Sequence, residues 1–437
     1  MPDATPLSDL LTRLEREGIR PGLADTAALL ADLGDPQRAW PAVLVAGTNG
    51  KGSTSALLAA ILAAAGRRVG HYTSPHLERA EERIRVAGRP VPAARLVELL
   101  EQVVRTAVAR GRPTPTYFEA MTVAAFLHFA HERIDLAVLE VGMGGRLDAT
   151  NLADPRLSLV TSIDLDHREY LGETLGAIAR EKAGVFRSGR PALMLARHAE
   201  ALAALRASAA ACGADLRDAA PEVARTAVLA EGWDGQRLRI DTGSGPRQLW
   251  LPLAGRHQAA NLTLAVLAAE ELARLGLVAL ETGTVERGVA SCRWPGRLER
   301  IELPGGGAVL LDAAHNPAGI ARLVEFLAAR EARYVLLFGA LADKEVGEML
   351  PPLLPRALAA VLTEPESPRA LPAAALARAV PPTLPVRVVP DRPEALRAAL
   401  ALGAEHGSAL VVAAGSIYLI GELRVQLRHT FGVPAPV

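Results

Sequence analysis

The chain has 437 residues, more than one ordinary domain holds, so two or three domains are expected. Its formal net charge is zero, which gives no support to a nucleic-acid partner or to a strongly charged protein partner. The two cysteines, Cys212 and Cys292, lie far apart in the chain, which excludes a disulfide framework and suggests a reducing, cytoplasmic setting.

The sequence predicts neither export nor a membrane span. Its first residues lack a basic segment followed by an apolar core, so we expect no signal peptide. The longest apolar runs, such as residues 409–420, fall short of the roughly 18–20 residues that a membrane-spanning helix needs. We therefore expect a soluble protein, with a monomer as its working form and small molecules as its partners.

Helices and apolar strands alternate through the first half of the chain. Short helices are predicted over residues 1–40, where Leu10, Leu11 and Leu14 have helical spacing. A strand begins at Val43, and a glycine-rich turn leads from it into a helix that ends near Ala65. The next predicted strands are 68–72, 136–141, 157–163 and 192–195, and the helices are 93–110, 118–132 and 175–186. Such alternation indicates a parallel sheet covered on both faces.

The pattern changes after residue 225. Short segments over 226–253 suggest a small antiparallel patch, and helices are predicted at 257–275 and 285–290. Adjacent Pro295 and Gly296 predict a boundary between residues 1–296 and 297–437. Beyond it, strands are expected near 298–303, 309–313, 334–338, 359–362, 386–389 and 410–413, with helices between them and mostly loops over 351–385. A second α/β domain follows from this pattern.

The glycine-rich turn is the first candidate functional element. It reads Gly47-Thr48-Asn49-Gly50-Lys51-Gly52-Ser53-Thr54. Backbone N–H groups and the helix dipole favour an anion there, Lys51 adds positive charge, and Ser53 offers a hydroxyl to Mg²⁺. The general nucleotide-loop pattern has four residues between its glycines and none between Lys and Ser, so Gly52 is unusual. The segment predicts a phosphate-binding loop, with a plain glycine-rich turn as the alternative.

Two strand ends near this loop carry acidic groups. Glu140 ends one strand, where such folds hold Mg²⁺ on nucleotide phosphates, although capping a helix would be another use for it. The next strand ends in Asp164, Asp166 and His167, which strengthens the metal hypothesis.

Further polar clusters follow along the chain. Gln258 and Asn261 share one face of a predicted helix, where they could contact a base edge or cap the helix. Judged by its own position in the sequence, Lys182 is predicted to be a solvated side chain and not a functional one. Asp312 and His315 end a strand of the second domain, so we expect a ligand between the two domains.

Seven motifs, in this order, resemble those of folylpolyglutamate synthases and dihydrofolate synthases in the Mur ligase superfamily. They lie at residues 47–53, 72–77, 139–151, 165–167, 181–184, 312–317 and 415–418, and the resemblance extends from about residue 8 to 428. Gly52 is that family's own variant of the loop. The resemblance implies an α/β fold: a Rossmann-like P-loop ATPase domain with a mostly parallel sheet (residues 1–296), then a smaller Rossmann-like C-terminal ligase domain (297–437).

The resemblance also implies an ATP-dependent acid–amino-acid ligase. A carboxylate is activated by ATP to an acyl phosphate, which the amine of L-glutamate attacks, releasing ADP and phosphate. The motifs look most like the bifunctional bacterial form, which uses dihydropteroate and reduced folates. The alternatives are a monofunctional member, another Mur-type amino-acid ligase, a non-catalytic nucleotide-binding regulator and a phosphoryl-transfer kinase.

Site residues are implied by position in the motifs. The ATP phosphates would be held by Thr48, Asn49, Gly50, Lys51, Gly52, Ser53, Thr54 and Arg297, the adenine by Asn261 and the ribose by Asp312. The two Mg²⁺ ions would be bound by Ser53, Glu140, His167 and a carbamylated Lys182. His315 would act in the phosphoryl region, with Lys51 and Lys182 as the other catalytic groups, and Phe118 and Asp148 would hold the pterin. Two departures from the family pattern are Ala313, where glycine is commoner, and the charge of Asp164; the general base is not identified.

Overall fold

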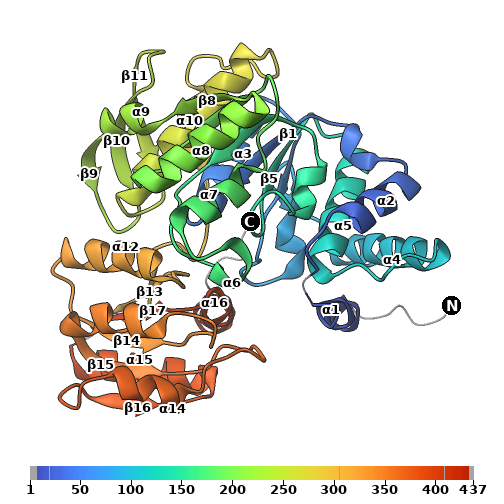
Figure 1. Cartoon of the computed structure of the whole chain (residues 1–437). Coiled ribbons are helices and arrows are strands. Elements are labelled where there is room, and N and C mark those ends of the chain that lie inside the picture. Colours follow the sequence, from blue (N-terminus) through green and yellow to red (C-terminus); the bar gives the residue numbers. More distant parts are fainter. Residues whose placement is uncertain (1–6, 19, 305, 408, 433–437) are drawn as a thin grey trace.

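The computed structural model describes residues 7–18, 20–304, 306–407 and 409–432. The chain forms two α/β units, one built on an eight-stranded sheet and one on a six-stranded sheet, with a small antiparallel sheet beside the first (Figure 1). We call the eight-stranded and six-stranded sheets, each together with the helices that cover it, the first layer and the second layer. Among the described helices, none is long and apolar enough to cross a membrane.

Two helices precede the first sheet. They are α1 (Leu7–Glu15) and α2 (Ala24–Asp32). Leu10 and Leu14 of α1 are buried and Leu11 packs against the same core, as their spacing predicts. Residues 1–6 of the predicted helical region lie outside the described residues.

The first sheet has the strand order β4-β3-β2-β5-β1-β6-β7-β8. Its strands are β1 (Ala42–Ala46), β2 (Val69–Tyr72), β3 (Ile84–Val86), β4 (Arg89–Pro90), β5 (Leu136–Glu140), β6 (Pro155–Val160), β7 (Pro191–Met194) and β8 (Asp215–Asp218). The run from β2 to β8 is parallel, and β3 and β4 add an antiparallel edge. Sequence patterning missed β3, β4 and β8, which are short and only partly apolar.

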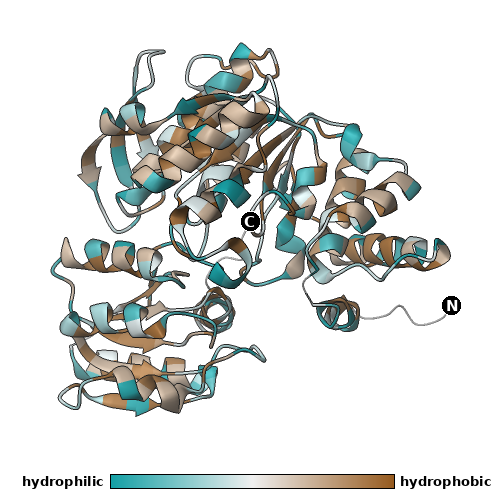
Figure 2. Cartoon of the chain, viewed as in Figure 1, coloured by the Kyte–Doolittle hydropathy of each residue, from teal (hydrophilic) through white to brown (hydrophobic). Residues whose placement is uncertain are grey.

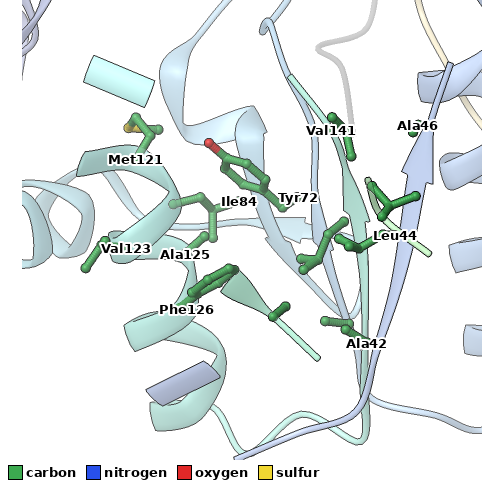
Figure 3. Close-up of a cluster of buried hydrophobic side chains, with 14 of the residues drawn as sticks. Ala42, Leu44, Ala46, Tyr72, Ile84, Met121, Val123, Ala125, Phe126 and Val141 are labelled. Atoms are coloured by element: carbon green, nitrogen blue, oxygen red, sulfur yellow. The ribbon is translucent and has the colours of Figure 1, made fainter. Parts of the chain in front are cut away.

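Side chains alternate between the two faces of the central strand β1. Leu44 pairs with Leu139 of β5, and it points with Ala42 and Ala46 into a core shared with Tyr72 (Figure 3). Val43 and Val45 point into the opposite core. The first core is covered by α4 (Ala93–Ala109), α5 (Tyr117–His131), α7 (Leu175–Ala183) and α8 (Ala199–Cys212), the second by α3 (Lys51–Ala64), α10 (His257–Arg274) and α11 (Thr284–Ser291). Burial of both faces explains the near-continuous apolar strands.

The predicted antiparallel patch is a three-stranded sheet ordered β11-β10-β9. Its strands are β9 (Ala227–Glu231), β10 (Gln236–Asp241) and β11 (Pro246–Leu251). Leu238, Ile240, Leu249 and Leu251 pack into the same core as α10. This small sheet therefore extends the first layer.

The second sheet has the order β12-β13-β17-β14-β15-β16, parallel except for β12. Its strands are β12 (Glu299–Glu302), β13 (Ala308–Leu311), β14 (Tyr334–Phe338), β15 (Ala357–Leu362), β16 (Val386–Val388) and β17 (Leu410–Ala414). The longer helices around it are α12 (Pro317–Ala328), α15 (Arg392–Glu405) and α16 (Ile417–Phe431). Apolar residues gather on its strands, whereas its helices carry polar outer faces (Figure 2).

Short helical turns complete the described chain. They are α6 (Arg168–Leu171), α9 (Ala220–Ala224), α13 (Val346–Met349) and α14 (Ala373–Leu376), with 3-10 turns at Pro36–Arg38, Ala80–Arg83, Ala149–Leu152, Pro351–Arg356 and Ala377–Ala379. The expected α/β fold with a mostly parallel first sheet is confirmed. The strand expected over 157–163 ends earlier, at Val160. Thr161 still donates its N–H to Ala46 of β1, but Ser162 bonds to Thr48 and Asn49 of the glycine-rich loop instead of a neighbouring strand.

Candidate active site

The loop between β1 and α3 exposes the N-terminus of a helix. Gly47 and Gly50 have φ values of 142° and 88°, which residues with side chains rarely adopt. A Cβ at Gly47 would also collide with Thr161. Gly50 is the N-cap of α3, so the first N–H groups of that helix remain available to an anion.

The loop is held by the residues that follow β6. Thr48 donates its N–H to the Ser162 carbonyl at 2.7 Å, and Thr161 Oγ1 donates to the Asn49 carbonyl at 2.8 Å. The Asp164 carboxylate accepts from Ser162 Oγ at 2.7 Å and from Asn49 Nδ2 at 3.3 Å. The charge of Asp164, which departs from the family pattern, therefore takes part in bracing the phosphate loop.

Two lysines converge on the same loop. Lys51 Nζ donates to the Thr48 carbonyl at 3.0 Å, and Lys182 Nζ donates to the Gly47 carbonyl at 2.9 Å. Burial, aided by the positive charge of Lys51, lowers the pKa of Lys182 to about 7. A substantial fraction of this amine is therefore neutral near pH 7, and the neutral amine is the form that reacts with CO₂.

Glu140 ends β5, and His167 lies between β6 and α6. Burial raises the pKa of Glu140 to about 7, although Lys51 and the N–H of Ser74 favour its charged form. His167 caps α6 with a left-handed φ of 51°, and burial lowers its pKa. A buried carboxylate with a raised pKa and a neutral imidazole both suit a cation.

The predicted metal ligands fit Mg²⁺ only in part. Ser53 and Glu140 supply the oxygens that Mg²⁺ prefers, whereas His167 supplies a nitrogen, which suits transition metals better. Within the described residues, no three His, Cys, Asp or Glu side chains form a metal-binding cluster. The predicted set has only two such side chains, so a carbamate on Lys182 would add the anionic oxygen ligand that it lacks.

Polar residues of the second sheet form the side of the site opposite the phosphate loop. Asp312 follows β13, and its carboxylate accepts the N–H groups of Leu298 at 2.8 Å and Ala314 at 3.0 Å. Nδ1 of His315 lies 2.9 Å from the Ala313 carbonyl, which can only accept, so Nδ1 carries the proton. Burial lowers the pKa of His315 to about 4, which leaves its Nε2 unprotonated at neutral pH.

These elements line one cavity of about 420 Å³, a size typical of small-molecule sites. The predicted residues on its wall are Thr48, Asn49, Gly50, Lys51, Gly52, Ser53, Glu140, His167, Lys182, Asn261, Arg297, Asp312 and His315. Thr54 is buried beneath the loop and does not line the cavity. Residues from both halves of the chain therefore meet at the carboxyl ends of parallel strands, where α/β folds bind ligands.

The remaining predicted residues lie beside or behind this wall. Asn261 donates through Nδ2 to Gln258 at 2.9 Å, and a Cβ at Gly50 would lie 2.5 Å from its Oδ1. Phe118 and Asp148 do not line the cavity but pack behind Gly142, which does. The Asp148 carboxylate accepts the N–H groups of Met143 and Thr150, both at 3.0 Å, and the Thr150 hydroxyl at 2.5 Å.

Sequence reasoning missed the polar contacts that cross the cleft. Lys344 Nζ lies 3.3 Å from Asp166 Oδ1. Asn316 Nδ2 donates to Asn49 Oδ1 at 3.1 Å and to Asp166 Oδ2 at 3.3 Å. Lys344 follows strand β14, so the rule used for the other strand ends could have singled it out. Arg197, Arg256 and Arg322 also line the cavity and add positive charge to it.

Family models identify the fold and its chemistry. The Mur ligase middle domain matches residues 45–269, and the glutamate ligase domain of Mur ligases matches residues 296–417. The chain is a Mur ligase. The expected class of ATP-dependent amide ligases is confirmed.

Relatives place this Mur ligase in the dihydrofolate synthase/folylpolyglutamate synthase family. It is 38% identical over 384 residues to the dihydrofolate synthase/folylpolyglutamate synthase of Mycobacterium tuberculosis, covering 83% of this chain and 78% of the relative. It is 37% identical over 428 residues to the probable bifunctional folylpolyglutamate synthase/dihydropteroate synthase of Halobacterium salinarum. That match covers 97% of this chain, but the chain spans only 52% of the relative.

Solved structures agree with this placement. Escherichia coli FolC in complex with DHPP and ADP has a TM-score of 0.85 at 31% identity, covering 98% of this chain and 99% of that one. A bifunctional folylpolyglutamate synthase/dihydrofolate synthase with Mn, AMPPNP and L-glutamate bound has a TM-score of 0.81 at 32% identity, covering 97% and 98%. The resemblance expected from the seven motifs is confirmed, whereas the roles of individual residues remain predictions.

Proposed function

We propose that this Mur ligase uses ATP to join L-glutamate to dihydropteroate and to reduced folates in a single site. One observation carries the proposal: Lys51, Glu140 and Lys182 of the first layer share a cavity with Asp312 and His315 of the second. The DHPP, nucleotides and glutamate named for solved relatives support the same substrates. A kinase would not need the second polar wall.

The first step transfers the γ-phosphoryl group of ATP to a carboxylate oxygen of the pterin substrate, and ADP leaves. Triphosphate and carboxylate are both anionic, so their approach requires neutralisation. Lys51, Arg297 and the N–H groups at the start of α3 would hold the phosphates in line with the attacking oxygen.

Mg²⁺ would be held by two pairs of residues. Ser53 and Glu140 would bind one ion, and His167 and a carbamylated Lys182 would bind a second. When bound, the ions would reduce repulsion between the triphosphate and the carboxylate. Carbamylation joins the neutral Lys182 nitrogen to the carbon of CO₂ and releases one proton, so a cation becomes an anionic oxygen ligand.

In the second step, the neutral amine of glutamate attacks the acyl carbon. The C–O bond to phosphate breaks, phosphate leaves, and the nitrogen loses its proton as the amide forms. Nε2 of His315 is unprotonated in the unliganded protein, and a phosphate anion beside it would raise its pKa. His315 would then bind the phosphoryl group through a charged Nε2–H.

The remaining roles concern recognition of the substrates. Asn261 would contact the adenine and Asp312 the ribose, while Phe118 and Asp148 would hold the pterin by its ring face and its amino-pyrimidine edge. The Asp148 carboxylate already accepts hydrogen bonds from Met143 and Thr150. We therefore expect the segment after Gly142 to rearrange when the pterin binds.

Phosphate release tests the function directly. The assay measures ATP-dependent release of phosphate with L-glutamate and either dihydropteroate or a reduced folate as the acceptor. Release with both acceptors is expected. Release with only one would show a monofunctional enzyme, and release with neither would overturn the folate assignment.

Three further proposals concern the whole chain. We propose a division at residues 296 and 297, which is supported by two sheets that share no strand. A cytoplasmic setting and a monomeric state are also proposed. Light scattering on the purified protein would test the monomer.

A further inference from the structure

A tryptophan of the segment that joins the two layers lies against the phosphate loop. A Cβ on Gly52 would lie 2.9 Å from Cζ2 of Trp294 and 3.1 Å from its Nε1. Gly52 lies within α3 and is not among the glycines with positive φ. Its lack of a side chain is therefore required by the indole ring and not by the backbone conformation.

The indole ring is fixed by two buried side chains. The guanidinium carbon of Arg85 lies 5.5 Å from the ring centroid, within the range of a cation–π contact. The imidazole of His71 lies 5.8 Å away at an interplanar angle of 43°. Arg85 and His71 are each only 6% exposed, so the ring cannot move aside without disturbing groups in the interior.

The same histidine also reaches Gly52 by hydrogen bonds. Nε2 of His71 lies 3.0 Å from Ser55 Oγ, and Ser55 Oγ donates to the Gly52 carbonyl at 3.0 Å. Because the single hydroxyl proton of Ser55 is used on Gly52, Nε2 of His71 must be the donor to Ser55. Gly52 is thus held at its Cα by Trp294 and at its carbonyl by Ser55.

The other end of this segment is bonded to the second layer. The Gly296 carbonyl accepts the N–H of Ala313 at 2.9 Å, and the Gly296 N–H donates to Glu299 at 2.9 Å. Ala313 lies two residues before His315. A stretch of three residues, from Trp294 to Gly296, therefore connects the phosphate loop to the opposite wall of the cavity.

We propose that Trp294 is a positioning residue that sets the start of α3 for nucleotide binding and couples it to the placement of the second layer. Gly52 is glycine because it must admit the indole ring. The inference rests on the proposed function only in taking the loop as the nucleotide site.

A double-mutant cycle tests the contact through nucleotide affinity. The affinity for AMPPNP with Mg²⁺ is measured by calorimetry for the wild type, Gly52→Ala, Trp294→Ala and the double variant. We expect about a tenfold loss for Gly52→Ala and a severalfold loss for Trp294→Ala, with the double variant no weaker than Trp294→Ala. Wild-type affinity in Gly52→Ala, or losses that multiply in the double variant, would overturn the proposal.

Matched controls separate positioning from general damage. Trp250→Ala removes an exposed indole on β11, and Arg293→Ala changes an exposed neighbour of Trp294; both should bind AMPPNP as the wild type does. Thermal unfolding verifies that each variant is folded. Where Trp294→Ala does not fold, Trp294→Phe replaces it in the cycle, since a smaller ring should also relieve Gly52→Ala.

Steady-state kinetics add a second readout. Gly52→Ala and Trp294→Ala should each raise KM for ATP more than KM for L-glutamate. Equal changes in both constants would contradict the proposal that Trp294 acts first on nucleotide binding. Failure of the folate assay with intact AMPPNP binding would count against the proposed function alone, because the affinity cycle does not depend on the acceptor.

Discussion

Two of the places where the layers touch each other differ in burial and in bonding. On the cleft side, Lys344 meets Asp166 at 3.3 Å, with side chains 11% and 12% exposed. On the other side, which we call the hinge side, the Glu78 side chain is fully buried and pairs with Arg424 at 2.5 Å, while Arg424 also pairs with Glu299 at 2.9 Å. Longer contacts thus face the cavity, and a network of shorter ion pairs that share their partners lies behind it.

This difference indicates which contact can separate. Arg428 adds a second cation to the hinge at 2.8 Å from Glu78, and a Cβ on Gly421 would collide with the Leu77 carbonyl. Breaking the hinge would leave a buried charge uncompensated, whereas the cleft pairs can exchange partners with water or with a ligand. We therefore expect substrates to enter by opening the cleft side while the hinge stays closed.

The largest expected effect is on turnover, and it comes from a residue on the cleft side that is proposed to take part in the reaction. Lys182→Ala should reduce turnover by about a thousandfold or more, because the proposed carbamate ligand can no longer form. High bicarbonate should not restore activity, since no amine remains. The measurement is ATP-dependent phosphate release. Arg180→Ala, an exposed change in the same helix, should keep full activity, and near-normal turnover in Lys182→Ala would reject the carbamate role.

The hinge side should respond in stability instead. Glu78→Gln should lower the free energy of unfolding by about 3–5 kcal/mol, because Arg424 and Arg428 lose their shared buried carboxylate. Denaturant unfolding measures this change. Glu98→Gln removes an exposed pair with Arg95 and should change stability by about 0.5 kcal/mol or less. Equal losses of unfolding free energy in the two variants would show that the hinge ion pairs stabilise the fold no more than an exposed pair does.

Acid should also weaken the packing around His71, beside Trp294. Burial lowers the pKa of His71 to about 3, so between pH 6.5 and 3 the unfolded chain binds more protons than the folded protein. Stability from this group is complete above pH 6.5 and is lost as the pH falls towards 3. Between pH 7.5 and 5, His71→Gln should lose about 1–2 kcal/mol less than the wild type, whereas exposed His131→Gln should match it. Identical pH profiles for all three would contradict this prediction.

The smallest effect on stability is expected at the cleft contact. Lys344→Met should change the free energy of unfolding by about 1 kcal/mol or less, because its 3.3 Å bond to Asp166 is long and Asp166 keeps the hydrogen bond from Asn316. The KM values for the substrates should change severalfold, because the arrangement in which the cleft side is closed loses one of its bonds. A stability loss as large as that of Glu78→Gln would show that both sides hold the layers equally.

Local sequence patterns predicted most of the helices and strands. For the contacts described above, they identified one of the two residues but not its partner. The apolar alternation of β1 and the glycines of the loop are visible in a few residues of sequence, as are the strand-end groups Glu140 and His167. The partners across the molecule are not. Trp294 lies far from Gly52 in the chain, and Arg424 is 346 residues from Glu78, so no periodic pattern relates them.

The same limit applies to roles within the site. Family position suggested Asp148 for the pterin, yet periodicity could not reveal that its carboxylate is already used by Met143 and Thr150. Asp164 appeared as an unexplained charge, and only its bonds to Asn49 and Ser162 relate it to the loop. Sequence indicates which groups are present; how many of their bonds are already made depends on packing.

The hinge network also has a consequence for synthesis on the ribosome. Glu78 belongs to the first layer, but its partner Arg424 lies 346 residues later, in helix α16. At about 5–20 residues per second, roughly 17–70 seconds separate their translation. During that interval the first layer has the Glu78 carboxylate but not its partner Arg424. We therefore expect the packing of α16, the last described helix, to be a late step of folding.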